Sequence, residues 1–388
     1  MNGWLRWPST YLGVPMLAAC AATALAYELP AGYVGGLLLL AAAALATMAA
    51  DAVVGPRLPQ FERIRARDYA GTREALVALA FCAVVGAFCL LDLLLFPIPL
   101  LDDPSAYARL DGARTHVRHV SAWCWVLAPV GLLCVRSRGL RYAMVAAAIA
   151  FPVLVIDRNR IFAALFSIAL VRLMRRDPAR ALPWPAVALL ALAGAALFSL
   201  LGIVRSGTLD GLTLPLQPWF RDAPAGLKWP VLYISAGPYN FAAILDKGYR
   251  NADFLLNQLV PLRGSIATAG TGIPLDAANI NVGTEFFPFL MALGPAGALA
   301  AFATLYGLLV WSARRLAGAS LFALLMFLRV AYTAAMAPFA PQAFTFMTAV
   351  FLAACLLMQL FAAWLPDRRA CAGRCAAGPS NALDAPNR

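Results

Sequence analysis

Charged residues are scarce in this chain. Only 13% of its 388 residues are Asp, Glu, Lys or Arg, whereas about a quarter of a soluble domain is charged. Lys and His each occur only twice. This scarcity excludes a soluble enzyme, a disordered chain and a nucleic-acid-binding domain. The sequence also lacks a Walker loop, a dinucleotide-binding glycine motif and a Ser-His-Asp set, so the common soluble chemistries have no support.

Apolar residues dominate instead, at 62% of the chain with a mean hydropathy of +0.75. Ten membrane spans of about 20 residues would need about 200 apolar positions, which matches this excess. The sequence therefore predicts an all-α fold, a polytopic transmembrane helical bundle of about ten spans. The predicted spans are 11–27, 31–50, 75–96, 120–135, 140–156, 161–174, 184–204, 286–311, 319–337 and 342–365.

The net charge of +12 is explained by membrane topology, because cytoplasmic loops collect Lys and Arg. Most of the arginines fall in alternate connections and in the two terminal segments. We therefore expect both termini in the cytoplasm, an even number of spans, a lipid bilayer as surroundings and no nucleic-acid partner. The expected parts are a bundle of about seven spans (1–204), a large periplasmic loop with short helices (205–285), about three further spans (286–365) and a disordered cytoplasmic tail (366–388).

Metal and cofactor chemistry have no sequence support. Six of the eight cysteines lie in apolar runs, where Cys behaves as a small hydrophobe. Cys371 and Cys375 have no second pair, and His116 and His119 lack a nearby carboxylate. We expect no metal site, no cofactor and no disulfide framework.

One short charged segment interrupts the apolar stretch 140–174, namely Asp157-Arg158-Asn159-Arg160. A single helix over this stretch would run about 52 Å, too long for a hydrocarbon core of about 30 Å. Two short helices with a charged tip fit better, and the tip should face a protein cavity. Two arginines against one Asp leave surplus positive charge that suits phosphate, although a plain interfacial anchor is the alternative.

Three further arginines could bind an anion. Arg205 ends a span, Arg263 precedes glycines in the long loop, and Arg329 lies inside a span. The respective alternatives are snorkelling to the interface, an ordinary solvated loop, and a structural ion pair of Arg329 with Asp92. Together these arginines predict a phosphate or diphosphate ligand that is reached from the outer leaflet.

Aromatic and amide side chains gather in the same loop and suit the faces and hydroxyls of sugars. The ones we select are Tyr233, Tyr239, Asn240, Asn281 and Thr284. An interfacial aromatic belt is the alternative. The surrounding stretch 229–245 is interrupted by Gly237-Pro238, so we expect an interfacial or re-entrant helix pair, or else a simple cap on the bundle.

These segments resemble the oligosaccharide repeat-unit (O-antigen) polymerases. The run from Asn281 to Phe287 with the following Leu293-Gly294-Pro-Ala-Gly297 resembles their signature after the large periplasmic loop, and 233–241 is similar to their aromatic-glycine element. The segment 157–160 resembles a Ser-Arg element that O-antigen polymerases and ligases share. The likeness covers about 150–310, and the sequence departs from it in having Leu293-Gly294 in place of an Asp-Phe-Gly element.

The resemblance implies a metal-independent membrane glycosyltransferase of the bacterial inner membrane. Its substrate would be undecaprenyl-diphosphate-linked oligosaccharide, joined at the periplasmic face into O-antigen, capsule or exopolysaccharide, with a chain-length regulator protein as partner. Arg158 or Arg160 would hold the leaving diphosphate, with Arg205, Arg263 and Arg329 in reserve. Glu285 would be the base for the acceptor hydroxyl, and Asp246 and Asp253 are alternatives.

Two other functions stay open. An O-antigen ligase resembles this topology but uses a His in the large loop, and this loop has none. A polysaccharide or lipid transporter without chemistry would need a polar path through the bundle. Charges in the first four spans are sparse, with Asp92 as the exception, so the polymerase is favoured over both.

Overall fold

The computed structural model describes residues 3–102, 112–177, 179–180, 183–206, 215–260, 273–275 and 282–366. Every regular element in this part of the chain is a helix, and one isolated bridge joins Tyr27 to Leu216. The α-helices are α1 (Pro8–Tyr11), α2 (Gly13–Ala26), α3 (Tyr33–Val54), α4 (Glu62–Ala66), α5 (Arg73–Leu95), α6 (Gly112–Ser121), α7 (Leu127–Cys134), α8 (Arg138–Leu154), α9 (Arg158–Arg175), α10 (Trp184–Ser206), α11 (Pro218–Arg221), α12 (Ala225–Lys247), α13 (Asp253–Leu259), α14 (Phe287–Arg315), α15 (Leu321–Ala335) and α16 (Phe346–Trp364).

The all-α prediction is confirmed for these residues, and the apolar helices are consistent with a multi-pass membrane protein. Each of the ten predicted ranges contains a helix. Seven segments are long and apolar enough to cross a membrane, and α15 is a shorter apolar helix. The seven are Pro8–Ala26, Tyr33–Arg57, Arg73–Leu95, Arg114–Cys134, Val187–Val204, Phe287–Gly318 and Phe346–Trp364.

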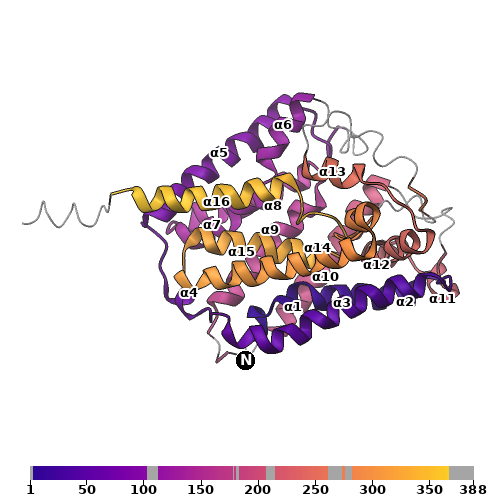
Figure 1. Cartoon of the computed structure of the whole chain (residues 1–388). Helices are drawn as coiled ribbons and strands as arrows, with labels where there is room; N and C mark the ends of the chain where they lie inside the picture. Colours follow the sequence, from indigo (N-terminus) through magenta and orange to yellow (C-terminus); the bar gives the residue numbers. More distant parts are fainter. Residues whose placement is uncertain are drawn as a thin grey trace, which may run out of the picture.

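The long helices run roughly side by side, so the molecule has two ends (Figure 1). Arginine-rich connections meet at one of them, which we call the basic end. There Arg63 donates to the Ala317 carbonyl at 2.9 Å, and Arg175 donates to the Arg67 carbonyl at 3.3 Å. Several connections that the charge pattern assigned to one side of the membrane therefore lie together.

Helix α12 lies at the opposite end, which we call the α12 end (Figure 1). It packs on α2, α3 and α10: the Ser235 carbonyl accepts from Thr23 near the end of α2, and Ala242 packs on Gly36 at the start of α3. The predicted helix pair is wrong, because Gly237 and Pro238 lie inside one continuous helix. The second half of α12 is buried, and this packing overrides the low helix propensity of both residues.

Buried carboxylates join the helices. Asp51 of α3 accepts from the Ser9 backbone N–H and the Tyr306 hydroxyl, each at 2.8 Å, and so ties α1 and α14 to α3. Asp92 of α5 is fully buried and pairs with Arg114 and Arg118 of α6 at 3.2 and 3.3 Å. An ion pair between Arg329 and Asp92 is therefore wrong. Asp92 fixes one helix on another and gives no support to a polar path for transport.

Candidate functional site

The charged tip is built by a tight turn between α8 and α9 at the α12 end. Ile156 has a φ of 53°, which is unusual for a β-branched residue and stores strain. Asp157 then caps α9, because its Oδ1 accepts the Arg160 backbone N–H at 3.2 Å. The turn thus delivers several polar side chains at the start of an otherwise apolar helix.

The two tip arginines have different partners. Arg158 is 8% exposed, and its guanidinium lies over the Tyr233 ring of α12 at 4.9 Å from the centroid. The Nε atom of Arg160 is 2.8 Å from Asp157 Oδ2, and its Nη1 lies 3.4 Å from the Ser121 hydroxyl. Arg158 therefore packs toward α12, whereas Arg160 belongs to an ion pair beside the end of α6.

Arg160 and Arg329 line the same cavity of about 270 Å³, which we call the polar cavity. Arg329 donates twice to the Thr348 hydroxyl, at 3.2 and 2.8 Å, and no carboxylate of the described residues lies within 4 Å of it. Since Asp157 balances Arg160, the described lining keeps a net positive charge. The lining residues are Ala122, Trp123, Trp125, Asp157, Asn159, Arg160, Ala163, Arg329, Tyr332, Pro341, Gln342, Thr345 and Met347.

Glu285 lies outside this cavity and is fully buried. Its carboxylate accepts three backbone N–H groups, from Gln342, Ala343 and Phe344. Gln342 lines the polar cavity. The geometry thus makes Glu285 a positioning residue that fixes the connection between α15 and α16. Glu285, the predicted base, therefore does not face the polar cavity. Backbone N–H groups of the α15–α16 connection donate to both of its carboxylate oxygens.

Burial is the main influence on this carboxyl and raises the pKa of Glu285 to about 7, although the three N–H groups and Arg329 lower it. Since the unfolded value is 4.5, the folded state holds the proton more tightly. Proton binding by Glu285 therefore contributes about 3 kcal/mol to the free energy of unfolding below pH 4.5. This contribution is lost as the pH rises from 4.5 to 7.

Glu285→Gln mimics the protonated carboxyl at every pH. We expect the melting temperature of the wild type to fall relative to that of this variant between pH 4.5 and 7.5. Thermal unfolding of both purified proteins in detergent measures the difference. Parallel pH profiles would show that the carboxyl does not titrate in this range.

Most of the predicted sugar-binding residues on α12 and in the segment 282–286 are buried in contacts within the fold. Tyr239 is stacked on Tyr27 at 4.3 Å between ring centroids. Asn240 is buried and donates to the Val282 carbonyl at 2.7 Å, and Thr284 is buried as well. A Cβ on Gly237 would collide with the Pro338 carbonyl, so glycine is required for this close approach. These residues hold α12 against the segments around the polar cavity without lining it.

The other predicted residues lie outside the described part of the chain or do not line the polar cavity. Arg263 and Asn281 lie outside the described residues, as does the tail beyond residue 366. Arg205 lies in the last turn of α10, and its side chain is outside the described part. Asp246 and Asp253 are exposed and do not line the polar cavity.

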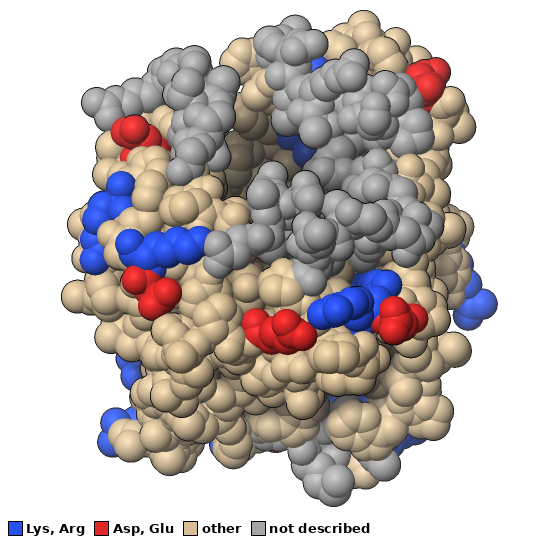
Figure 2. All heavy atoms as spheres, turned by 90° about the vertical axis from the view of Figure 1, so that its right-hand side faces the viewer, with Lys and Arg blue, Asp and Glu red and all other residues tan. Residues whose placement is uncertain are grey.

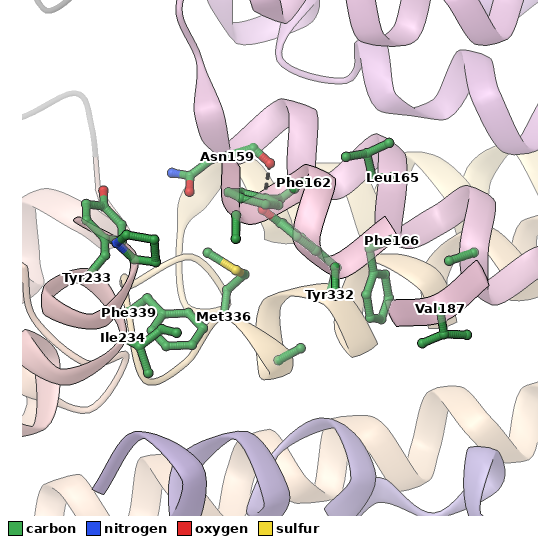
Figure 3. Close-up of a pocket in the computed structure, with 16 residues that line it drawn as sticks. Asn159, Phe162, Leu165, Phe166, Val187, Tyr233, Ile234, Tyr332, Met336 and Phe339 are labelled. Atoms are coloured by element: carbon green, nitrogen blue, oxygen red, sulfur yellow. Dashed lines mark hydrogen bonds between the residues drawn. The ribbon is translucent and has the colours of Figure 1, made fainter. Parts of the chain in front are cut away.

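An apolar cavity of about 460 Å³ adjoins the polar one, between α9, α10, α12 and α15 (Figure 3). Asn159 and Tyr332 line both, and the Tyr332 hydroxyl donates to the Asn159 carbonyl at 2.6 Å. The lining residues are Asn159, Phe162, Leu165, Phe166, Ala169, Val187, Ala191, Gly194, Ala195, Pro230, Tyr233, Ile234, Tyr332, Ala335, Met336 and Phe339.

Some lining residues were missed by sequence reasoning. Tyr332 lies three residues after Arg329 on the same helix face, a spacing that could have identified it. In the sequence, Trp123 and Trp125 look like ordinary apolar residues of a span. No local pattern identifies Gln342, because the contact with the distant Glu285 fixes its position.

The α12 end is hollowed, with atoms of Lys or Arg visible at the bottom (Figure 2).

No family model, no curated protein and no solved structure matches this chain. Its function is therefore inferred from the two adjoining cavities together with the sequence resemblance described above.

Proposed function

We propose that the chain is a membrane glycosyltransferase that polymerises polyprenyl-diphosphate-linked oligosaccharide repeat units. One observation carries the proposal: a cation-lined polar cavity adjoins an apolar cavity, and Asn159 and Tyr332 line both. This pairing suits an amphiphile whose anionic head and apolar chain are covalently joined. A soluble sugar nucleotide would leave the apolar cavity unused.

The diphosphate would lie in the polar cavity. Arg329 has no described carboxylate partner, so a bound phosphate oxygen would neutralise it. Arg160 would donate further hydrogen bonds to the diphosphate from its planar guanidinium, which the ion pair with Asp157 holds in place. Arg158 would act as a positioning residue through its contact with Tyr233.

The polyprenyl chain would lie along α9 in the apolar cavity. From Asn159 to Ala169 this face of the helix extends about 15 Å, since each residue adds about 1.5 Å. That length is about half of the hydrocarbon core. It would hold the first isoprene units, and the rest of the chain would extend into lipid.

In the reaction, an acceptor hydroxyl oxygen on the next lipid-linked unit attacks the anomeric carbon of the growing chain. A new glycosidic C–O bond forms, and the bond to the diphosphate breaks with its electron pair going to the diphosphate oxygen. The hydroxyl proton passes to the leaving diphosphate, because a phosphate oxygen with a last pKa of about 6 can accept it near neutral pH. No base is then required from Glu285.

The proposed orientation puts the basic end in the cytoplasm and the α12 end in the periplasm of a bacterial inner membrane, with about ten spans and both termini inside. The meeting of the arginine-rich connections at one end supports it. A chain-length regulator remains a proposal from the resemblance.

The surface-glycan ladder of a gene-deletion strain tests the proposal. We expect loss of the ladder to a single-repeat band, rescue by the wild type, and no rescue by Arg160→Ala combined with Arg329→Ala. An unchanged ladder would contradict polymerase activity. Loss of the single-repeat band as well would instead indicate a ligase or a transporter.

Filling the apolar cavity should weaken substrate binding without touching a charge. A Cβ on Gly194 would have only Phe162 in ordinary contact, at 3.7 Å, so Gly194→Leu would place its side chain in the cavity. We expect about a tenfold rise in KM for the lipid-linked substrate, because about 1.4 kcal/mol of apolar contact is displaced. Gly86→Leu on α5, where a Cβ meets nothing within 4 Å, is the matched control. Equal KM values for both variants would contradict the assignment.

A further inference from the structure

A third cavity, of about 1070 Å³, lies at the basic end between α7, α8, α9 and α10. We call it the basic cavity. Five arginines line it, and Asp68 is the single acidic residue among the described lining. The arginines are Arg136, Arg141, Arg172, Arg175 and Arg176. The proposed glycosyl transfer uses none of them.

One face of α9 gives this cavity two zones. Leu165, Ile168 and Ala169 line its inner part, and Arg172 follows one turn later toward the helix end. Leu165, Ala169 and Val187 also line the apolar cavity. The two cavities therefore adjoin along α9 and α10. An apolar slot that ends in cations has the polarity of a lipid with an anionic headgroup.

The arginines of the basic cavity differ in the hydrogen bonds and ion pairs that hold their side chains. Arg141 donates twice to the Val135 carbonyl, at 3.1 and 2.8 Å, and Arg175 donates to the Arg67 carbonyl. Arg136 lies 3.4 Å from Asp68 across a pair whose side chains are 75% and 70% exposed, so the pair holds it weakly. Arg172 has no hydrogen bond or ion pair with a described residue. Arg136 and Arg172 are thus the two cations best placed to bind a phosphate.

We propose that the basic cavity binds an anionic glycerophospholipid of the leaflet at the basic end. Arg136 and Arg172 hold its phosphate, and an acyl chain lies against Leu165 and Ile168. Basic pockets between membrane helices are suited to anionic lipid headgroups. Topology alone would place arginines at this end but would not gather five of them around a cavity that continues into an apolar slot. The site is separate from the proposed diphosphate site and does not depend on glycosyltransferase activity.

Native mass spectrometry of the delipidated full-length protein tests the site, with phosphatidylglycerol and phosphatidylcholine as probes. We expect one phosphatidylglycerol bound in clear preference to phosphatidylcholine. Arg136→Gln with Arg172→Gln should weaken this binding about 30-fold. Each arginine near a lipid phosphate contributes about 1 kcal/mol, and about 2 kcal/mol for the two corresponds to that factor. Arg57→Gln with Arg314→Gln removes the same charge from exposed residues of the same end outside the cavity and should change binding less than twofold.

Three results would overturn the proposal. Equal weakening by both pairs of substitutions would indicate diffuse surface charge. Equal binding of both lipids would remove the role of the anionic headgroup. Displacement of phosphatidylglycerol by millimolar inorganic phosphate would indicate a site for soluble anions. Because the substituted arginines are exposed, thermal unfolding should be unchanged in both variants, which separates lost binding from lost folding.

Discussion

Arg329→Met should lower the rate of polymerisation about 10²–10³-fold, the usual cost of removing one preorganised group that stabilises a developing negative charge. Arg329 lies inside apolar α15 and faces the polar cavity, and its described hydrogen bonds go only to the Thr348 hydroxyl. A cation in this position is costly for a membrane helix. The substitution should therefore leave the melting temperature unchanged or raise it while activity is lost.

The rate is measured with purified protein in lipid nanodiscs, as the lengthening of a polyprenyl-diphosphate-linked oligosaccharide. Arg314→Met, at the exposed basic end of α14, is the matched control and should keep full activity. Arg329→Lys preserves the charge but not the planar, two-pronged hydrogen bonding of the guanidinium, and it should retain part of the rate. Wild-type activity in Arg329→Met would exclude the cation from the reaction, and a parallel loss of stability would assign it to the fold.

Some of the site could be predicted because membranes penalise charge so strongly. The tip at 157–160 stands out against apolar sequence on both sides, and the structure places Asp157, Asn159 and Arg160 around a cavity. Helix positions were predictable for the same reason, since apolar runs of the right length have few other solutions. Where composition alone dictates the outcome, the sequence is sufficient.

The partners of individual polar groups could not be predicted in this way. Glu285 accepts N–H groups more than 50 positions away in the chain, and no local pattern indicates that packing. Gly237 and Pro238 signal a break, yet α12 continues through them because its neighbours bury it. The pairing of Asp92 depends on where α6 docks on α5, which the sequence does not specify.

The largest effect on stability is expected from Asp92, which holds α6 against α5. Asp92 is fully buried, and Arg114 and Arg118 beside it are 7% and 6% exposed. Asp92→Asn would leave two buried cations without their shared anion, so we expect a loss of about 3–5 kcal/mol in the free energy of unfolding. Chemical unfolding in detergent measures it. Glu28→Gln breaks the exposed pair with Arg221 and should cost less than about 1 kcal/mol.

The cost should come from stranded positive charge and not from a lost attraction, and a third variant separates the two. Replacing Asp92, Arg114 and Arg118 together by Leu, Met and Met removes every charge of the triad and should recover most of the stability. Because α6 leads directly to Trp123 and Trp125 in the wall of the polar cavity, Asp92→Asn should also lower the rate of polymerisation. If the triple variant were as unstable as Asp92→Asn, the geometry of the ion pairs would itself hold α6 in place, and the polar cavity would depend on their directed hydrogen bonds.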